Sequence, residues 1–414
     1  MKILIHGLNF SPEIIGIGKY TGELAQWLAQ AGYDVHVVTA PPYYPKWKVQ
    51  KPFSSWRYQN ENWQGVQVIR CPLWVPRNPT GITRIIHLFS FAVSSFFAMI
   101  SQIKFKPEVV ISIVPTLFAA STTAWVASRC KATSWLHIQD FEVDAAANLG
   151  MVHSKNIMMR LAIQWEKSIL NRFDCISSIS NQMVKRLITK GVPEEKTVLF
   201  PNWVDTKIIY PLPTEDNSYR SKLGISNDQI VILYSGNMGS KQGLGLIVDV
   251  ARKLQENHQL VFVLCGNGSS RSELEKSAIG LINLKFLDIQ PIEELNHLLN
   301  SADIHILPQQ AEAADLVMPS KLLGMMASGK PIIATAHPGT ELANVVSQTG
   351  IVTPPGDVDA LVHAILQLAG SAELRKQLGK NSLELVKNKW SQEQVLSLFL
   401  KEIETILHNN NHTL

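Results

Sequence analysis

Residues 1–39 read MKILIHGLNFSPEIIGIGKYTGELAQWLAQAGYDVHVVT, and this stretch decides the fold. Residues 3–8 form an apolar run typical of a strand, and residues 18–31 show the periodicity of an amphipathic helix. Residues 34–39 form a second apolar run. A strand, a helix and a strand in this order make a βαβ unit, which predicts a parallel sheet covered by helices.

The same plan continues outward along the chain. Further strand-like runs in the first half are Val66 to Arg70, Val109 to Val114, Ala132 to Ile138 and Cys175 to Ser178. The second half repeats the pattern at Ile230 to Ser235, Leu260 to Cys265, Asp303 to Leu307 and Pro331 to Thr335, with a helix expected from Leu244 to Asn257. We therefore predict an α/β protein with two Rossmann-like, doubly wound domains.

The length supports this division, because 414 residues exceed what one hydrophobic core of about 250–300 residues accommodates. We expect an N-terminal domain over residues 1–200 and a hinge or linker over 201–220. A C-terminal domain follows over 221–388. A last helix, 389–408, is expected to pack back towards the N-terminal domain.

Charge is distributed unevenly between the halves. Residues 1–205 hold 21 Lys and Arg against 13 Asp and Glu, while residues 206–414 hold 17 against 21. A basic half suits phosphates, nucleic acid or an anionic bilayer, and charge alone does not separate these. The apolar start is soon broken by polar residues, unlike a signal peptide, and the four cysteines lie far apart. We expect reduced thiols, no metal site and a cytoplasmic location.

Two glycine turns are candidate ligand sites. Gly16 and Gly18 lie between the first strand and helix, where backbone N–H groups would approach a phosphate or sugar, although a tight structural turn explains them equally well. The turn after Ser235 contains Asn237 and Lys241, and a cation beside a helix N-terminus suits a leaving pyrophosphate. A solvated surface lysine is the alternative.

Motifs in the second half then make a family resemblance specific. The chain carries Pro308, Pro319-Ser320-Lys321 and Ala327-Ser328-Gly329-Lys330-Pro331, and Pro201-Asn202-Trp203-Val204-Asp205 lies between the halves. These motifs resemble the signature of family 4 glycosyltransferases. Together with residues 6–13 and with His137-Ile138-Gln139-Asp140, they are most similar to the subgroup that acts in colanic acid and related exopolysaccharide synthesis.

The resemblance implies a GT-B fold, in which the two domains face a cleft. It also implies a UDP- or GDP-sugar donor bound by the C-terminal half, an acceptor bound by the N-terminal half, retention at the anomeric carbon and no obligatory metal or other cofactor. Asn237, Lys241, Asp315, Ser320 and Lys321 are the expected donor-binding residues, with Gly16 and Gly18 in the first half. The sequence departs from the family at Gly324, where a second Glu is expected to hold the ribose.

His137 and Asp140 are the candidate catalytic residues. They follow an apolar strand, and parallel sheets bind ligands at the carboxyl ends of their strands. His137 would hydrogen-bond the donor sugar or the acceptor hydroxyl, and Asp140 would orient it or activate the acceptor. The alternative for His137 is a structural histidine.

Residues 43–84 are basic and rich in tryptophan, and residues 85–103 contain no Asp, Glu, Lys or Arg. We favour a buried crossover helix for residues 85–103, over a peripheral contact with the inner membrane or a true membrane span. The basic stretch matches no nucleic-acid-binding module, so no nucleic-acid partner is expected.

The resulting hypothesis is sugar transfer to a growing, lipid-linked surface polysaccharide. A nucleotide-sugar epimerase of the same fold and a catalytically silent nucleotide-sugar-binding partner remain alternatives. The Asp357-Val358-Asp359 motif imitates a metal-binding D-x-D, but it directly precedes an apolar-periodic helix, so capping is the expected role of Asp357.

Overall fold

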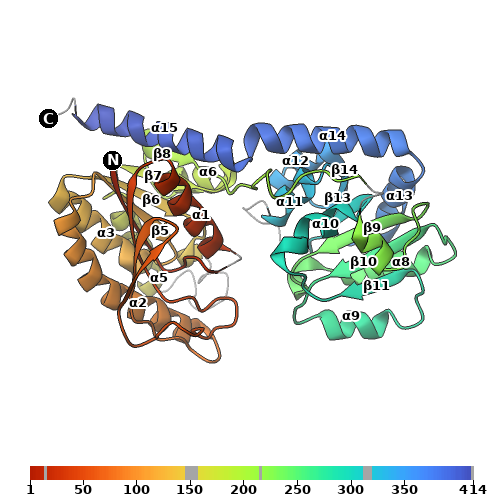
Figure 1. Ribbon diagram of the computed structural model, residues 1–414, viewed down its shortest axis with the longest axis horizontal. Helices are drawn as coiled ribbons and strands as arrows, with labels where there is room; N and C mark the ends of the chain where they lie inside the picture. Colours follow the sequence, from red (N-terminus) through yellow and green to blue (C-terminus); the bar gives the residue numbers. More distant parts are fainter. Residues whose placement is uncertain (14–15, 145–156, 214–216, 311–318, 412–414) are drawn as a thin grey trace. The chain divides into compact units, whose positions relative to one another are not determined.

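The computed structural model describes residues 1–13, 16–144, 157–213, 217–310 and 319–411 of the chain. Its contacts divide into two compact units, each built from a sheet and helices, as the labels in Figure 1 indicate. Unit 1 comprises Met1–Pro201 together with Leu396–Leu414, and unit 2 comprises Asn202–Val395.

Unit 1 is built on an eight-stranded sheet in the order β3-β4-β2-β1-β5-β6-β7-β8. All neighbouring strands pair in parallel except β3 and β4, which form an antiparallel hairpin at one edge. The strands are β1 (Lys2–Gly7), β2 (Asp34–Thr39), β3 (Gln59–Trp63), β4 (Val66–Arg70), β5 (Val109–Val114), β6 (Thr133–Ile138), β7 (Cys175–Ser178) and β8 (Thr197–Leu199).

The central strands of unit 1 are buried on both faces, which is why they are continuous apolar runs rather than alternating ones. Helices connect them as crossovers, and α2 runs beside α3 (Figure 1). The helices are α1 (Ile17–Gln30), α2 (Gly81–Ser101), α3 (Leu117–Cys130), α5 (Ile157–Leu170) and α6 (Asn181–Thr189), with short 3-10 turns η1 (Gln102–Phe105) and η2 (Glu194–Lys196).

Unit 2 has a six-stranded, entirely parallel sheet in the order β11-β10-β9-β12-β13-β14. Its strands are β9 (Ile230–Ser235), β10 (Leu260–Cys265), β11 (Leu284–Leu287), β12 (Ile304–Leu307), β13 (Ile332–Thr335) and β14 (Gly350–Thr353). Its helices are α7 (Ser218–Lys222), η4 (Ser240–Gln242), α8 (Gly245–Lys253), α9 (Arg271–Ser277), η5 (Ile292–Glu294), α10 (Leu295–Asn300), α11 (Lys321–Ala327), α12 (Glu341–Thr349), α13 (Val358–Ala369) and α14 (Ala372–Lys389). The described helices and strands of both units confirm the prediction of two Rossmann-like sheets.

Helix caps explain where several helices begin. The side chain of Asp357 accepts a hydrogen bond from the backbone N–H of Ala360 over 2.9 Å at the start of α13. This satisfies one of the free N–H groups of the first turn and confirms that Asp357 is a cap. Asp359 instead pairs with Lys253, so the two aspartates of the motif have different partners.

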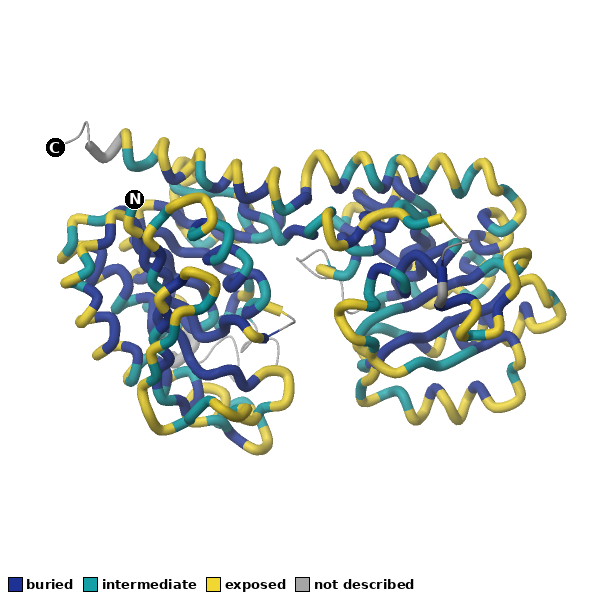
Figure 2. The backbone as a smooth tube through the Cα atoms, viewed as in Figure 1, coloured by how far each residue is buried: buried dark blue, intermediate teal, exposed yellow. Residues whose placement is uncertain are grey.

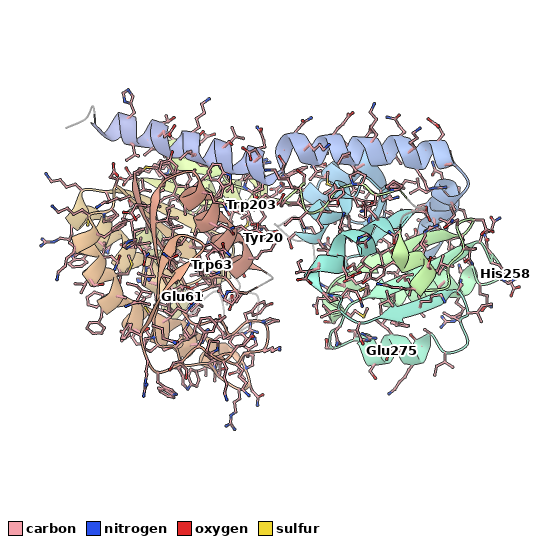
Figure 3. All side chains as sticks on the ribbon, viewed as in Figure 1. Tyr20, Glu61, Trp63, Trp203, His258 and Glu275 are labelled. Atoms are coloured by element: carbon pink, nitrogen blue, oxygen red, sulfur yellow. The ribbon has the colours of Figure 1, made fainter. Side chains whose placement is uncertain are left out.

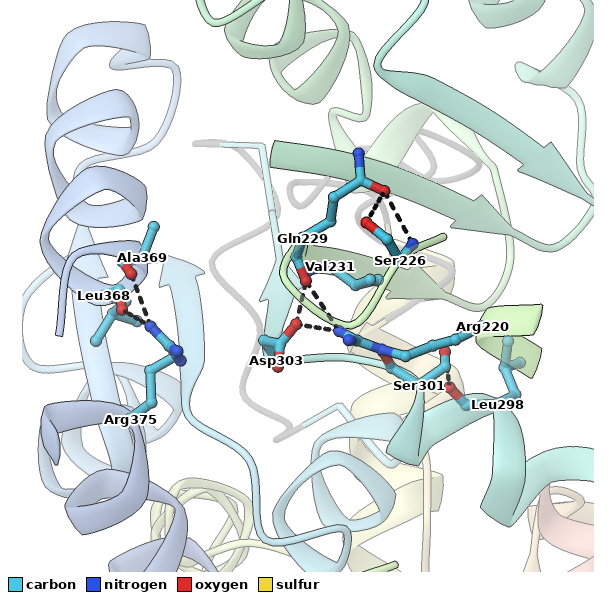
Figure 4. Close-up of polar contacts among 10 residues, drawn as sticks. All are labelled: Arg220, Ser226, Gln229, Val231, Leu298, Ser301, Asp303, Leu368, Ala369 and Arg375. Atoms are coloured by element: carbon cyan, nitrogen blue, oxygen red, sulfur yellow. Dashed lines mark hydrogen bonds and ion pairs between the residues drawn. The ribbon is translucent and has the colours of Figure 1, made fainter. Parts of the chain in front are cut away.

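The segment after the first unit is anchored to unit 2. Arg220 of α7 donates hydrogen bonds to the backbone carbonyls of Ser301 and Gln229 and forms an ion pair with Asp303, as Figure 4 shows. Asp303 also accepts from the backbone N–H of Val231 at the start of β9. Because the buried guanidinium is paired and hydrogen-bonded, α7 is fixed against the amino ends of β9 and β12.

The last helix, α15 (Gln392–Asn411), supplies apolar side chains to unit 1. The Phe399 ring stacks on Phe200 with 4.3 Å between centroids, and it meets Trp135 of β6 edge-on at 4.9 Å. All three side chains are buried, so the end of the chain completes the core of the first unit.

Candidate functional site

Two glycine turns lie against each other at the carboxyl end of the unit 2 sheet. Gly236 follows β9 and Gly266 follows β10, and a Cβ atom on Gly266 would overlap the carbonyl oxygen of Gly236. The N–H of Gly236 donates to the carbonyl of Cys265 over 2.9 Å, and that of Met238 donates to Asn267 over 2.8 Å. The missing side chains let the two backbones approach, which fixes the turn where ligands bind in such sheets.

Lys321 reaches this turn from the first residue of α11. Its Nζ atom lies 2.9 Å from the hydroxyl of Tyr234 and 4.3 Å from the centroid of the same ring. The Tyr234 hydroxyl donates in turn to the carbonyl of Asn237 over 2.5 Å. The side chain of Lys321 also lies so close to Gly236 that a Cβ there would be 3.3 Å from Nζ. Two motifs far apart in the sequence therefore meet in one site.

The electrostatics of Lys321 set it apart from a surface lysine. Burial lowers the pKa of its ammonium to about 8, because the charged form loses hydration. No carboxylate among the described residues forms an ion pair with it. A cation that is held with a neutral partner and is only partly hydrated favours an anionic ligand.

The other predicted donor residues are placed as follows. Asn237 is exposed in the turn after β9, and Ser320 is exposed at the N-cap position of α11. The backbone places Lys241 within η4, which follows that turn. Asp315 lies outside the described residues. The structure thus brings Asn237 and Lys321 together.

Gly324, which replaces the expected acid, lies in the middle of α11. A Cβ atom at this position would lie 3.3 Å from the Leu299 side chain of α10. A larger residue would therefore need Leu299 to move. The nearby Leu299 side chain gives a structural reason for glycine at this position.

In unit 1, Gly18 at the start of α1 packs against a buried carboxylate, whereas Gly16 lies near the ring of Tyr44. Gly16 adopts a left-handed φ of 66°, and a Cβ on Gly18 would overlap Oε2 of Glu13. Oε1 of Glu13 accepts hydrogen bonds from the backbone N–H groups of Tyr43 and Tyr44 at 3.1 and 3.0 Å. Burial raises the pKa of Glu13, although these hydrogen bonds oppose the shift. The close approach of Glu13 explains Gly18 without a ligand.

Arg70 joins the same loops from β4. Its Nη2 donates to the carbonyl of Ser11 over 2.6 Å and its Nη1 to that of Ala40 over 3.1 Å. Its Nε donates to Glu61 of β3 over 2.7 Å, and Figure 3 labels Glu61 on this strand. The guanidinium is 1% exposed, so burial lowers its pKa while Glu61 raises it. These contacts hold the loops that follow β1 and β2 at the carboxyl edge of the sheet.

His137 occupies β6 and is buried. Its Nδ1 lies 2.9 Å from the hydroxyl of Ser177, which also accepts a hydrogen bond from Trp135 Nε1 over 2.7 Å. Its ring lies 4.9 Å from that of Phe200. Burial lowers the pKa of His137 to about 3, so the imidazole is neutral at physiological pH. His137 is thus a neutral, buried hydrogen-bonding group, as the structural alternative also requires.

Asp140 is exposed beyond the end of β6, and a second acid lies close to it. Glu142 accepts a hydrogen bond from the backbone N–H of Leu117, the first residue of α3, over 3.1 Å. Burial raises the pKa of Glu142 to about 7, with a further contribution from the charge of Asp140. A carboxyl group with this pKa changes protonation near neutral pH and is a candidate acid or base.

Tyr234 and Glu142 were not among the residues predicted from the sequence. The available signal for Tyr234 was a polar aromatic residue two positions before a glycine turn, in an otherwise apolar strand. Glu142 follows Asp140 by two positions in the same loop. Neither signal identifies the hydrogen-bond partner, because Tyr234 contacts Lys321 and Glu142 contacts Leu117, which lie in other elements of the chain.

Comparison with known families and proteins agrees with this geometry. Residues 16–203 match the family described as "Glycosyl transferase 4-like domain", and residues 215–384 match "Glycosyl transferases group 1". WcaI of Escherichia coli (strain K12), whose name assigns it to colanic acid biosynthesis as a glycosyl transferase, is 40% identical over 97% of this chain and 100% of its own length.

Solved structures share the fold at low sequence identity. The sucrose-phosphate synthase of Thermosynechococcus elongatus superimposes with a TM-score of 0.72 at 19% identity and covers 99% of both chains. HepE of Anabaena, solved with UDP and glucose, has a TM-score of 0.69 at 14% identity and covers 98% of this chain and 100% of its own. These likenesses support the GT-B fold, and with the family matches they show that this chain belongs to the family 4 glycosyltransferases.

Proposed function

We propose that this enzyme transfers a sugar from a UDP- or GDP-sugar to a growing, lipid-linked surface polysaccharide, with retention at the anomeric carbon. Retention follows the family, and the polysaccharide follows the name of the WcaI relative. HepE of Anabaena has also been solved with UDP-glucose, which supports a nucleotide-sugar donor. The observation in this chain that carries the proposal is the buried ammonium of Lys321 beside the Gly236 turn.

Lys321 fits the leaving group of this reaction. In sugar transfer the bond from the anomeric carbon to the pyrophosphate breaks, and the bond to the acceptor oxygen forms. The electron pair of the broken bond stays on the departing phosphate, so negative charge develops on the nucleoside diphosphate, which then takes up the acceptor proton. A positioned ammonium with backbone N–H groups nearby would stabilise that charge, and in a dry site this contribution is larger than in water.

Unit 1 would supply the acceptor side. His137 is neutral and faces Ser177, so its contribution would be a directed hydrogen bond rather than a charge. Asp140 and Glu142 follow the same strand and would accept hydrogen bonds from sugar hydroxyls. In such a mechanism the protein mainly orients the substrates, which by itself contributes several kcal/mol.

Donor turnover tests the proposal. Purified enzyme is incubated with UDP- and GDP-sugars and with membranes that contain lipid-linked oligosaccharides, and release of UDP or GDP is measured. A preceding thermal-shift screen selects the donor, since a ligand at 100 times its Kd adds about 2.7 kcal/mol of stability. If no nucleotide is released from any stabilising donor, the transferase assignment for this chain fails.

Product analysis separates the two alternatives. An epimerase would convert the nucleotide sugar into its isomer without an acceptor. A silent partner, which the glycine at position 324 suggests, would be stabilised by the donor without consuming it. Transfer of radiolabelled sugar into the lipid fraction, with release of one nucleotide for each sugar, is the expected result.

A further inference from the structure

The α2 helix is predominantly apolar, although the protein covers only one of its faces. The side chains that pack into unit 1 recur at helical spacing and are His87, Phe91, Ser95, Ala98 and Met99. Within Gly81–Phe105, which is long and apolar enough to cross a bilayer, only 33% of the most apolar window is buried. Figure 2 shows buried and exposed residues alternating along the helix. The prediction of a buried crossover helix is therefore correct for one face only.

The uncovered face is large and continuous along the helix. We call it the α2 surface, and its exposed residues are Ile82, Ile85, Ile86, Phe89, Val93, Phe96, Phe97 and Ile100. Ile82 is 72% exposed and Phe97 is 62% exposed. A helix of 21 residues is about 30 Å long, so this surface exceeds the scattered apolar residues of an ordinary protein exterior.

Aromatic side chains from other elements extend the α2 surface. Trp125 of α3 is 45% exposed and stacks on Phe96 with 6.4 Å between ring centroids. Tyr58 is exposed and donates a hydrogen bond to the carbonyl of Ser94 over 2.8 Å. Tryptophan and tyrosine favour the boundary between hydrocarbon and water, because one part of each ring is apolar and the other polar.

Polar contacts show that α2 belongs to the folded unit. Nδ1 of His87 lies 2.7 Å from the carbonyl of Trp74, and the hydroxyl of Ser94 donates to the carbonyl of Pro72 over 2.6 Å. Insertion of α2 across a bilayer would break these bonds and place the imidazole of His87 in hydrocarbon without its partner, which is costly. The structure therefore favours contact with a membrane surface over a span.

The charges around the α2 surface identify the kind of membrane. The chain contains no Asp or Glu between Glu61 and Glu108. Exposed cations lie near both ends of α2: Arg77 and Arg84 at its start, and Lys104 and Lys106 after its end. Each cation near an anionic lipid surface contributes about 1 kcal/mol. Cations in a stretch of sequence without acidic residues complement anionic headgroups, while the apolar face complements the acyl chains.

We propose that the α2 surface docks unit 1 onto an anionic lipid bilayer, with its apolar side chains in the outer part of the acyl region and the cations at the headgroups. This places the enzyme peripherally on a membrane and extends beyond its proposed reaction. The docking surface and the Lys321 site lie in different units, so one can fail without the other.

Vesicle binding of the full chain tests this proposal. The enzyme is sedimented with vesicles of phosphatidylglycerol and phosphatidylethanolamine, and separately with phosphatidylcholine vesicles. The α2 variant combines Ile82→Ser, Phe89→Ser and Phe97→Ser. A matched control combines Ile279→Ser, Ile282→Ser and Ile289→Ser, which are apolar residues of unit 2 that are on average more exposed than those of the α2 variant. We expect anionic vesicles to bind wild type and control alike, and the α2 variant at least tenfold more weakly.

A second variant keeps the test decisive if the first one misfolds. Arg84→Gln, Lys104→Gln and Lys106→Gln together should reduce binding to anionic vesicles and flatten its dependence on salt. Equal binding by wild type and the α2 variant would overturn the proposal, as would no binding by wild type. Resistance to carbonate extraction would indicate a span instead. A wild-type dimer that the α2 variant converts to monomer, without vesicle binding, would assign the surface to a second copy.

Discussion

The ammonium of Lys321 donates a hydrogen bond to the hydroxyl of Tyr234, and this one contact joins the Pro319-Ser320-Lys321 motif to the glycine turn after β9. Tyr234 also fixes the turn, because its hydroxyl donates to the carbonyl of Asn237. The lysine is thereby held at a defined position before any ligand arrives, which lowers the entropy lost on binding.

Removal of the ammonium should impair donor use. Hydrogen bonds to charged groups contribute about 1.5–3 kcal/mol, so Lys321→Met should lower the rate of donor turnover by about 10- to 100-fold. Tyr234→Phe keeps the cation and should have a smaller effect. Lys276→Met, on the exposed face of α9, is the control. Rates of Lys321→Met close to those of this control would remove Lys321 from the site.

Donor binding should depend on pH through Lys321. In the free enzyme its pKa is lowered to about 8, so the ammonium deprotonates as the pH rises through that value. A bound diphosphate favours the charged form, so binding above pH 8 requires proton uptake and becomes weaker. Between pH 7 and 9 we expect the affinity for UDP or GDP to fall by up to about tenfold.

Isothermal titration calorimetry measures both the fall in nucleotide affinity and the proton uptake on binding. Titrations at pH 8.5 in two buffers with different ionisation enthalpies give the number of protons taken up. In Lys321→Met this uptake should disappear and the affinity should become independent of pH over the same range. Identical pH profiles for wild type and variant would show that another group titrates.

The contact between the two glycine turns should be intolerant of a methyl group. Gly266→Ala would drive a Cβ into the carbonyl of Gly236 and displace the turn that carries Asn237, so donor binding should fall by tenfold or more. Gly280→Ala is the matched control, since Gly280 also has a positive φ but has open space around it. The control should lose only about 1 kcal/mol of stability. Thermal shifts with UDP or GDP compare the two variants directly.

Arg70 should stabilise the loops of unit 1. Arg70→Met removes hydrogen bonds to the Ser11 and Ala40 carbonyls and to Glu61, and each unpaired group costs about 1–3 kcal/mol. We expect a loss of roughly 3 kcal/mol or more in the unfolding free energy of unit 1. Arg57→Met, at an exposed position, should cost less than about 0.5 kcal/mol. Hydrogen exchange of peptides from residues 1–70 in increasing urea would report both values.

The sequence predicts the central strands well, because parallel strands buried on both faces are apolar runs that stand out from the more polar segments around them. It does not predict β3 (Gln59–Trp63), because most residues of this strand are polar and none of them is fully buried. The turn between β3 and β4 consists of Gln64 and Gly65, both with positive φ, and only the glycine announces it. The helix expected to end at Asn257 ends at Lys253, and the residues that follow form a turn.

Candidate site residues can be named from the sequence where a motif carries them, as for Lys321, which the structure places beside the Gly236 turn. They are not predictable where a contact depends on the fold. Tyr234 acquires its role only when α11 packs beside β9, and Glu142 only when the loop after β6 reaches the start of α3. The exposed half of α2 was likewise hidden, since composition alone does not distinguish a covered apolar face from an open one.

The contact between Gly236 and Gly266 also has a meaning for sequence variation. Since a side chain at 266 cannot coexist with the present path of the turn after β9, position 266 is free to change only when that turn takes another path. The residue at position 266, after β10, therefore indicates which path the loop after β9 takes. Homologous chains with a side chain at this position are expected to hold their donor by a rebuilt loop.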